Sequence, residues 1–361
     1  MKVKAALQDI PVYQPGKPLE EVKREFGLDE VIKLASNENP FGCSPTVWES
    51  LSTERDFFSL YPEGGAPLLR QQLATHLKVE PERLIFGNGS DEIIQMIGRA
   101  FLEPGTETVM ADITFPRYKT QALIEGAKAV EIPLKDGVHD LDGMAEAINE
   151  RTRIVWICNP NNPTGTIITA EQLATFMKKV PPHVLVVLDE AYEEYVTDPE
   201  YPDGIKEVLA NPRVIVLRTF SKIYGLAAFR IGYGVMDASL IQDINRVREP
   251  FNVNRLAQRA ALAGLADQDF VNQCRKANRE GIELFESHLT KLGLHYFPSQ
   301  GNFVLMDTGR NADEMFHHLL TKGIIVRSGV SLGYPTYIRV TVGSQEQNIQ
   351  FLNELDVAKS E

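Results

Sequence analysis

Residues 214–222 read VIVLRTFSK, and this stretch decides the fold. Its first four residues are apolar in succession, which is typical of a strand covered on both faces in a mainly parallel sheet. Thr219, Ser221 and Lys222 follow directly, where the strand ends. Because ligands of open α/β sheets gather at the carboxyl ends of strands, these three side chains are candidates for a binding site.

Similar apolar runs recur along the first two thirds of the chain and alternate with helical patterns. This alternation predicts an α/β fold with a doubly wound, mainly parallel sheet. The further runs lie at residues 83–86, 108–110, 154–157, 184–188 and 231–235.

The chain of 361 residues exceeds the size at which one core usually divides. We expect an extended arm over residues 1–35 that joins a small domain, a large domain over residues 36–250 and a small α+β domain over residues 251–361. The small domain is predicted to begin with a long helical stretch to residue 292. Its expected strands lie at residues 302–306, 324–326 and 337–342.

Composition excludes several classes of function. The net charge of -12 disfavours nucleic acid and anionic membranes as partners. The apolar runs fall short of the ~20 residues that cross a bilayer, and the N-terminus does not resemble a secretory signal, so we expect a cytoplasmic protein. Three widely spaced cysteines predict neither a disulfide nor a zinc site. Adjacent residues of a helix such as His317 and His318 point away from each other, and no second cluster of ligands accompanies them, so no metal is expected.

Lys222 is the most informative residue. Burial and the neighbouring cation Arg230 would both disfavour its ammonium form, and the neutral amine is a nucleophile towards an aldehyde. Asp189 ends the apolar run 184–188, and Tyr192 follows three residues later. An ionised acid there needs a cationic partner, such as a protonated pyridine nitrogen.

Two turns complete the predicted site. Asn162 lies in NPNNPTG after the run 154–157, where prolines and glycine hold the backbone and present the amide. Residues 87–92 read GNGSDE and link a strand to a helix whose free N–H groups can bind an anion. Each motif alone is also an ordinary turn or cap. Their occurrence together, each at a strand end, favours a functional site.

The set Asn162-Pro163-Thr164-Gly165, Asp189-x-x-Tyr192 and Ser221-Lys222 with Arg230-x-Gly232 resembles the signature of fold type I aminotransferases, which depend on pyridoxal 5'-phosphate (PLP). The resemblance spans nearly the whole chain. It implies a PLP-dependent transferase fold with a mainly parallel seven-stranded sheet, a smaller α+β domain and a homodimer with shared active sites.

The resemblance also implies residue roles. Lys222 would hold the cofactor covalently and shuttle a proton between the substrate α-carbon and the cofactor C4' carbon, and Asp189 would pair with the pyridinium. Asn162 and Tyr192 would contact the ring oxygen, and Phe115 would stack on the ring. The phosphate would be bound by residues from three segments and by Tyr61 of the neighbouring subunit. The residues of those three segments are Gly89, Ser90 and Asp91, Thr219 and Ser221, and Arg230.

Within that family, residues 34–40 (LASNENP), Arg327 and Arg339 are similar to those of histidinol-phosphate aminotransferases. Both arginines would bind substrate phosphate or carboxylate, since guanidinium groups contact either anion in bidentate fashion. Tyr13 resembles the arm tyrosine that closes over the substrate. The implied reaction converts histidinol phosphate and 2-oxoglutarate to imidazole-acetol phosphate and glutamate, in histidine biosynthesis.

Three alternatives stay open at this point. An aromatic-amino-acid aminotransferase and a threonine-phosphate decarboxylase of the same subfamily use similar arginines, and the variant sequence Phe115-Pro116-Arg117-Tyr118 leaves room for aromatic substrates. A non-catalytic PLP-binding effector domain is the remote alternative. Such domains accompany DNA-binding helices, and no basic helix-turn-helix pattern is evident.

Overall fold

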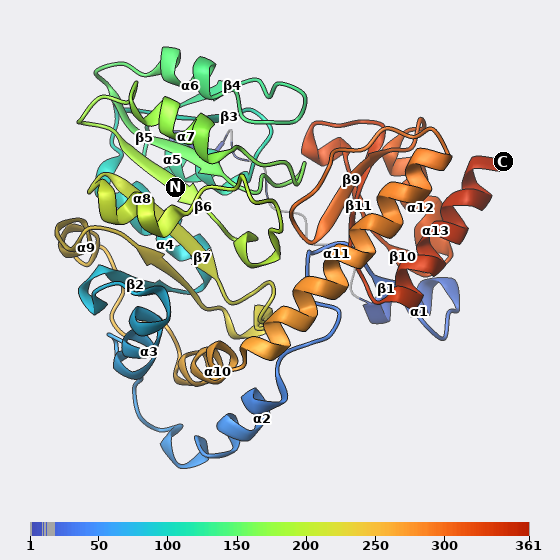
Figure 1. Ribbon diagram of the computed structural model, residues 1–361, viewed down its shortest axis with the longest axis horizontal. Coiled ribbons are helices and arrows are strands. Elements are labelled where there is room, and N and C mark those ends of the chain that lie inside the picture. Colours follow the sequence, from blue (N-terminus) through green and yellow to red (C-terminus); the bar gives the residue numbers. More distant parts are fainter. Residues whose placement is uncertain (1, 9, 11, 13–18, 361) are drawn as a thin grey trace.

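A seven-stranded sheet forms the centre of the molecule (Figure 1). The computed structural model describes residues 2–8, 10, 12 and 19–360. The strands are β2 (Leu84–Gly87), β3 (Glu107–Ala111), β4 (Lys128–Ile132), β5 (Thr152–Cys158), β6 (Leu185–Asp189), β7 (Val214–Thr219) and β8 (Gly232–Val235). Their order is β2-β8-β7-β6-β5-β3-β4, and only β8 runs antiparallel to its neighbours. The prediction of a mainly parallel α/β sheet is confirmed.

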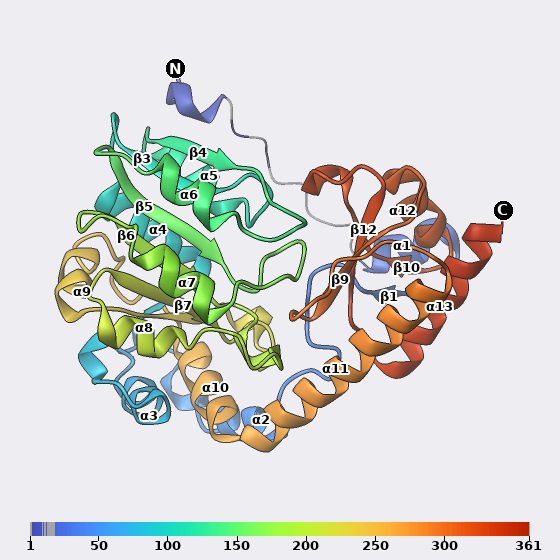
Figure 2. The same ribbon diagram turned by 45° about the horizontal axis from the view of Figure 1, so that its top comes forward.

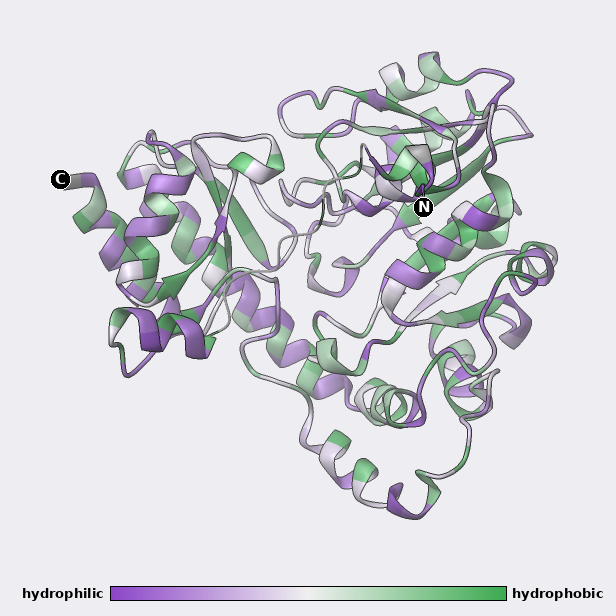
Figure 3. Cartoon of the chain, turned by 180° about the vertical axis from the view of Figure 1, so that it is seen from behind, coloured by the Kyte–Doolittle hydropathy of each residue, from purple (hydrophilic) through white to green (hydrophobic). Residues whose placement is uncertain are grey.

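Consecutive apolar residues of the central strands face opposite sides of the sheet. Val186 and Leu188 of β6 belong to one core cluster, whereas Leu185 and Val187 belong to the other. Both faces are therefore covered, and the strands are hydrophobic along their length (Figure 3). The edge strand β4 was not predicted, because it has a neighbour on one side only and its sequence KAVEI is partly polar.

Helices cover the two faces of the sheet. The first face carries α3 (Pro67–Leu77), α6 (Leu141–Ala147), α7 (Ala170–Met177), α8 (Gly204–Ala210) and α10 (Arg255–Ala266). The second face carries α4 (Gly89–Phe101), α5 (Arg117–Ile124) and α9 (Ala238–Ile244). Helix α2 (Pro45–Ser52) packs on α10. The 3-10 helices are η1 (Ala5–Leu7), η2 (Arg55–Phe57), η3 (Pro81–Arg83), η4 (Glu193–Tyr195), η5 (Ala227–Phe229) and η6 (Val330–Leu332).

A smaller α+β unit follows, and α11 runs into it from beside the large sheet (Figure 1). Strands β11, β12 and β9 form an antiparallel sheet, and β1 pairs in parallel with β10. The elements are α1 (Leu19–Phe26), β1 (Ile32–Lys33), α11 (Gln268–Lys291), β9 (Phe303–Asp307), α12 (Ala312–Thr321), β10 (Ile324–Ile325), β11 (Arg327–Ser328), β12 (Tyr337–Thr341) and α13 (Gln345–Ser360).

The helical stretch expected after residue 250 is divided into α10 and α11. Asp267 ends α10 and caps α11, because its side chain accepts a hydrogen bond from the N–H of Phe270. The cap therefore interrupts what the sequence alone suggested as one long helical pattern.

The N-terminal segment contacts both units. Val22 of α1 packs with Leu320 and Ile325 of the small unit, whereas η1 contacts α5 of the large one. Figure 2 shows the N-terminal end on the side of the large unit and α1 in the small unit. The proposed division of the chain at residues 35 and 250 stays a prediction. Among the described residues, no helix combines the length and the apolar character needed to cross a membrane.

Candidate active site

The carboxyl ends of β5, β6 and β7 bring the predicted residues together. Cys158 of β5 pairs with Asp189 of β6, and Asp189 pairs with Leu217 of β7. Asn162 and Lys222 follow shortly after β5 and β7 in the chain. Asn162, Asp189 and Lys222, which are 27 to 60 positions apart in the sequence, thus lie at one edge of the sheet.

Lys222 is half-buried beside cationic neighbours. Its Nζ lies 3.4 Å from the carbonyl oxygen of Ser36 and 5.5 Å from the centre of the Tyr192 ring. Burial, followed by the charge of Arg339, lowers the pKa of Lys222 to about 8. A large fraction of the amine is therefore neutral near that pH, as a nucleophile towards an aldehyde requires.

Asp189 has two carboxylate oxygens in different situations. Oδ2 accepts a hydrogen bond of 2.6 Å from the hydroxyl of Tyr118. Oδ1 is buried and has no hydrogen-bond partner among the described residues. Burial raises the pKa of Asp189 to about 6, and the Tyr118 hydrogen bond opposes this shift. A buried acceptor without a partner is costly, so Oδ1 fits a cationic N–H donor such as a protonated pyridine nitrogen.

Tyr192 lies under two amide groups. Its hydroxyl oxygen accepts hydrogen bonds from Nδ2 of Asn37 at 3.0 Å and from Nδ2 of Asn162 at 3.3 Å. Burial raises the pKa of the Tyr192 phenol, which therefore stays protonated. Because the two amides occupy the acceptor positions of the oxygen, the hydroxyl hydrogen can be donated to a ligand oxygen.

Arg339 connects this group to the small unit. Its Nη1 donates to Oδ1 of Asn162 at 2.6 Å and its Nη2 donates to the carbonyl oxygen of Ala35 at 2.8 Å. Arg327 of β11 lies directly opposite Arg339 of β12 in the sheet register. Both predicted substrate arginines therefore belong to one two-stranded segment at the site.

The start of α4 and the segment after β7 form a cradle around the guanidinium of Arg230. Arg230 Nη1 is 3.5 Å from Oγ of Ser221, and Nη2 is 3.6 Å from Oδ2 of Asp91. A Cβ atom added to Gly89 would come within 2.9 Å of Nη2 of Arg230. These groups, with the free N–H groups at the beginning of the helix, fit a phosphate.

Two glycines are required for this close approach. Gly89 has a φ of +72°, in the left-handed region that favours glycine. A Cβ atom on Gly232 would lie 2.5 Å from the backbone nitrogen of Ser90. Side chains at either position would therefore disturb the beginning of α4 or the cradle above it.

The remaining predicted residues lie less close to the lysine. Thr219 accepts a hydrogen bond from the N–H of Ser221, so part of its bonding capacity is used within the protein. Phe115 is half-buried and contacts the edge of Tyr118. Tyr61 is 80 % exposed and stacks on Phe251. Tyr13 lies outside the described residues.

Two residues of the site were missed by the sequence analysis. Asn37 lies in the quoted LASNENP segment, and Tyr118 lies in the quoted segment 115–118, but no role was assigned to either. Asn37 has a φ of +56°, which is uncommon for a residue other than glycine. This unusual backbone conformation marks the residue, but it is visible only in the structure. Nothing in the local pattern identifies Tyr118 as a partner of Asp189.

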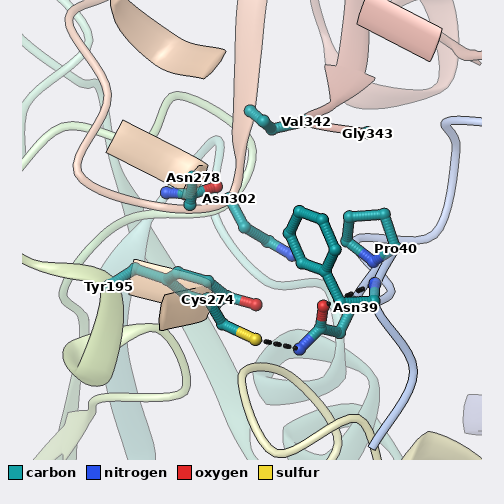
Figure 4. Close-up of a pocket in the computed structure, with 9 residues that line it drawn as sticks. Asn39, Pro40, Tyr195, Cys274, Asn278, Asn302, Val342 and Gly343 are labelled. Atoms are coloured by element: carbon teal, nitrogen blue, oxygen red, sulfur yellow. Dashed lines mark hydrogen bonds between the residues drawn. The ribbon is translucent and has the colours of Figure 1, made fainter. Parts of the chain in front are cut away.

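A small cavity lies apart from these groups, between the segment 39–41 and the small unit (Figure 4). Asn39 donates to Sγ of Cys274 across it at 3.3 Å. Its volume is about 10 Å³, which suits no more than one water molecule. The cavity cannot hold a substrate, and the candidate active site remains the group around Lys222.

Comparisons with known proteins agree with this geometry. A family model described as aminotransferase class I and II matches residues 29–355. The chain is 57% identical to a histidinol-phosphate aminotransferase of Brevibacillus brevis over 98% of both chains. It is 54% identical to one of a Geobacillus species over 98% of this chain and 97% of that one.

A solved structure gives the same result. The histidinol-phosphate aminotransferase of Sinorhizobium meliloti, in complex with pyridoxal-5'-phosphate, superimposes with a TM-score of 0.90 at 28% identity. The match covers 99% of this chain and 98% of that one. The chain belongs to the class I and II aminotransferase family. Its curated relatives place it in the histidinol-phosphate aminotransferase branch of that family.

Proposed function

We propose that the protein transfers the amino group of histidinol phosphate to 2-oxoglutarate, giving imidazole-acetol phosphate and glutamate, as a step of histidine biosynthesis. The relatives that share half or more of its residues support this substrate. The observation that carries the proposal is the opposed pair Arg327 and Arg339. Like charges placed opposite each other in an antiparallel sheet are unfavourable, and an anionic substrate would offset their repulsion.

Pyridoxal 5'-phosphate is the proposed cofactor. When bound, it supplies an aldehyde that bonds to amines and a ring that withdraws electrons from the substrate α-carbon. The buried, unpartnered Oδ1 of Asp189 would hold the proton of the ring nitrogen. The hydroxyl of Tyr192 and the amide of Asn162 would orient the ring oxygen, and Phe115 would cover one face of the ring.

The cradle would bind the cofactor phosphate. Gly89, Ser90 and Asp91 contribute the backbone at the start of α4, and Arg230 contributes positive charge. Ser221 adds its hydroxyl beside Arg230, with Thr219 behind it. A dianion bound there would also screen Arg230 from Asp91.

Lys222 would bind the cofactor aldehyde and later move a proton. With the substrate amine bound to the cofactor in its place, the neutral Nζ would be free to act as a general base at the substrate α-carbon and to deliver the proton at the cofactor C4' carbon. The lowered pKa of Lys222, about 8, suits a general base that works near neutral pH.

Arg327 and Arg339 would bind the two substrates in turn. For histidinol phosphate, both would contact the phosphate. For glutamate, Arg339 would hold a carboxylate, since Asn162 and Ala35 already orient its guanidinium. Tyr13 of the arm would close over the substrate.

A homodimer with shared sites is the proposed assembly. Tyr61 is exposed and stacked on Phe251 of its own chain. Trp48, Phe58 and Leu68 are also exposed on the same part of the sequence. An exposed apolar group of this kind marks a protein interface, and Tyr61 would reach the phosphate of the partner from it. We also propose a cytoplasmic location.

The test is a turnover measurement on purified protein. Glutamate formation from 2-oxoglutarate would be followed with histidinol phosphate, histidinol and phenylalanine as amino donors, with Lys222→Ala as the inactive control. We expect histidinol phosphate to be preferred. Equal rates with histidinol and histidinol phosphate would remove the role of the phosphate. Preferred use of phenylalanine would indicate an aromatic aminotransferase. Release of carbon dioxide from threonine phosphate, assayed in parallel, without glutamate formation would indicate a decarboxylase.

A further inference from the structure

Tyr118 contacts Asp189 through one of the two carboxylate oxygens. It is the second residue of α5 and is fully buried, and its hydroxyl donates to Oδ2 of Asp189 at 2.6 Å. Its ring stacks on the indole of Trp156, with centroids 4.9 Å apart and planes 10° from parallel. The phenol is thus held by packing before it forms the hydrogen bond.

This contact separates the two oxygens of Asp189. Oδ2 is bonded to Tyr118, whereas Oδ1 is buried without a hydrogen-bond partner among the described residues. A carboxylate bonded through one oxygen cannot exchange its two oxygens by rotation without breaking that bond. The free oxygen is therefore always the same one, and it faces away from Tyr118.

The contact also acts on the charge of Asp189. Burial raises the pKa of this carboxyl, and the Tyr118 hydrogen bond is the largest influence that lowers it. The other titratable groups that act on it are Asp91 at the start of α4, which raises its pKa, and Lys222 after β7, which lowers it. Cys158 of β5 pairs with Asp189, and burial raises the pKa of its thiol to about 12, so it is neutral.

Tyr118 itself is a constant donor. Burial and the neighbouring charge of Asp189 hold its pKa well above the usual value, so it stays protonated across the working pH range. Its hydrogen bond stabilises the carboxylate more than the neutral acid, because hydrogen bonds to charged groups are stronger.

We propose that Tyr118 is a positioning residue, which keeps Asp189 ionised and directs Oδ1 at the ring nitrogen of the cofactor. The inference rests on the proposed binding of pyridoxal 5'-phosphate. It assigns to Tyr118 an action through Asp189 and no contact with the substrate. The hydroxyl, and not the aromatic ring, carries this role.

The test measures the affinity of the cofactor-free protein for pyridoxal 5'-phosphate as a function of pH. Protonation of Asp189 removes the partner of the pyridinium, so affinity is lost as the pH falls through the pKa of Asp189. In Tyr118→Phe the pKa of Asp189 is higher. The fall of cofactor affinity on the acidic side of its pH profile, called the acidic limb, should therefore move to higher pH by about one unit. At a fixed pH on this limb, that shift is about a tenfold loss of affinity. The cofactor's own ionisations are the same for every variant and leave this comparison unaffected.

The matched control is Tyr224→Phe, which removes another buried phenol hydroxyl from the same domain. Its limb should coincide with that of the wild type. Melting temperatures of the cofactor-free variants show whether each is folded, and Tyr118→Phe retains the ring that stacks on Trp156.

A second measurement separates positioning from packing. If Tyr118 acts through Asp189, Tyr118→Phe should change cofactor affinity by less than about twofold in an Asp189→Asn background. An unmoved limb in Tyr118→Phe, or an equal loss in both backgrounds, would overturn the inference. A wild-type protein that binds no pyridoxal 5'-phosphate at any pH would instead overturn the proposed function.

Discussion

Arg327 lies directly opposite Arg339 across the antiparallel pair β11 and β12. Residues opposite each other in such a pair point to the same face of the sheet, so the two guanidinium groups share one side. Arg339 is buried and held by Asn162, which links the pair to the site around Lys222. Among the described residues, Arg327 forms no ion pair with an acidic side chain.

This pair predicts a difference between substrates. Removing Arg327 should lower kcat/KM for histidinol phosphate by on the order of tenfold or more, since a lost charged hydrogen bond costs about 1.5–3 kcal/mol. The loss for phenylalanine should be small, because its neutral side chain lacks that contact. The measurement is kcat/KM of Arg327→Ala with both donors under the same conditions.

Two further variants control this experiment. Arg310→Ala removes an exposed arginine of the small unit and should leave both values unchanged. Arg339→Ala should lower both, because Arg339 would hold the carboxylate of phenylalanine. Equal losses with the two donors in Arg327→Ala would mean that Arg327 has a structural role.

Asp189→Asn should reduce turnover much more than cofactor occupancy. The amide cannot stabilise the positive charge of the ring nitrogen, and loss of one preorganised electrostatic group costs about 10²–10³ in kcat. Affinity should fall, but occupancy with pyridoxal 5'-phosphate supplied in excess, measured by visible absorbance, should persist because the phosphate cradle is intact. Near-normal turnover would contradict the pairing of Asp189 with the ring nitrogen and would mean that Asp189 has a structural role.

Lys222 should react with the cofactor at a pH below that of an ordinary lysine. Burial and Arg339 lower its pKa to about 8, so the neutral fraction grows as the pH rises and reaches one half near that value. The rate at which cofactor-free protein forms a borohydride-trapped adduct at Lys222 should rise from about pH 6 and level off by about pH 9. A rate that rises unchanged to about pH 10.5 would indicate an ordinary lysine instead, and Lys222→Ala should form no adduct.

The proposed sharing of active sites between subunits predicts complementation between two defective variants. Tyr61→Ala should weaken cofactor binding, and Lys222→Ala should be inactive. In a mixed dimer, one site would combine Lys222 of one subunit with Tyr61 of the other, so mixing the two variants after dissociation should restore activity. Mixing Lys222→Ala with Asp189→Asn is the control in which Tyr61 is intact throughout. Activity no greater than the sum of the separate variants would argue against sharing through Tyr61.

Glu194 predicts a dependence of stability on pH. Both of its carboxylate oxygens are buried without a hydrogen-bond partner among the described residues. Burial raises its pKa from the ordinary 4.5 to about 8, so the folded protein retains a proton that the unfolded chain releases. The stabilisation of the folded state by this retained proton is fully present below pH 4.5 and is lost as the pH rises through about 8.

The difference in melting temperature between Glu194→Gln and the wild type should therefore change in favour of the variant by a few degrees as the pH rises from about 5 to about 8. Glu171→Gln, which changes an exposed acid of α7, should show no such gain. A constant difference between Glu194→Gln and the wild type across this range would mean that Glu194 is ionised in the folded state.

Much of the large domain could be predicted from short stretches of sequence. Strands β5, β6 and β7 are apolar on consecutive residues because both faces of the sheet are covered, and this pattern is local. The edge strand β4 lacks it, since one of its sides has no neighbouring strand. The division between α10 and α11 was missed because a single capping residue, Asp267, produces it.

The sequence by itself determined which residues end the parallel strands, and therefore that Asn162, Asp189 and Lys222 meet, because adjacent parallel strands present their carboxyl ends at one edge. Only the tertiary structure decided their partners. Tyr118 reaches Asp189 from 71 residues away, and Asn37 reaches Tyr192 from 155 residues away. Such contacts depend on how helices and arms pack onto the sheet, and no local periodicity encodes that packing.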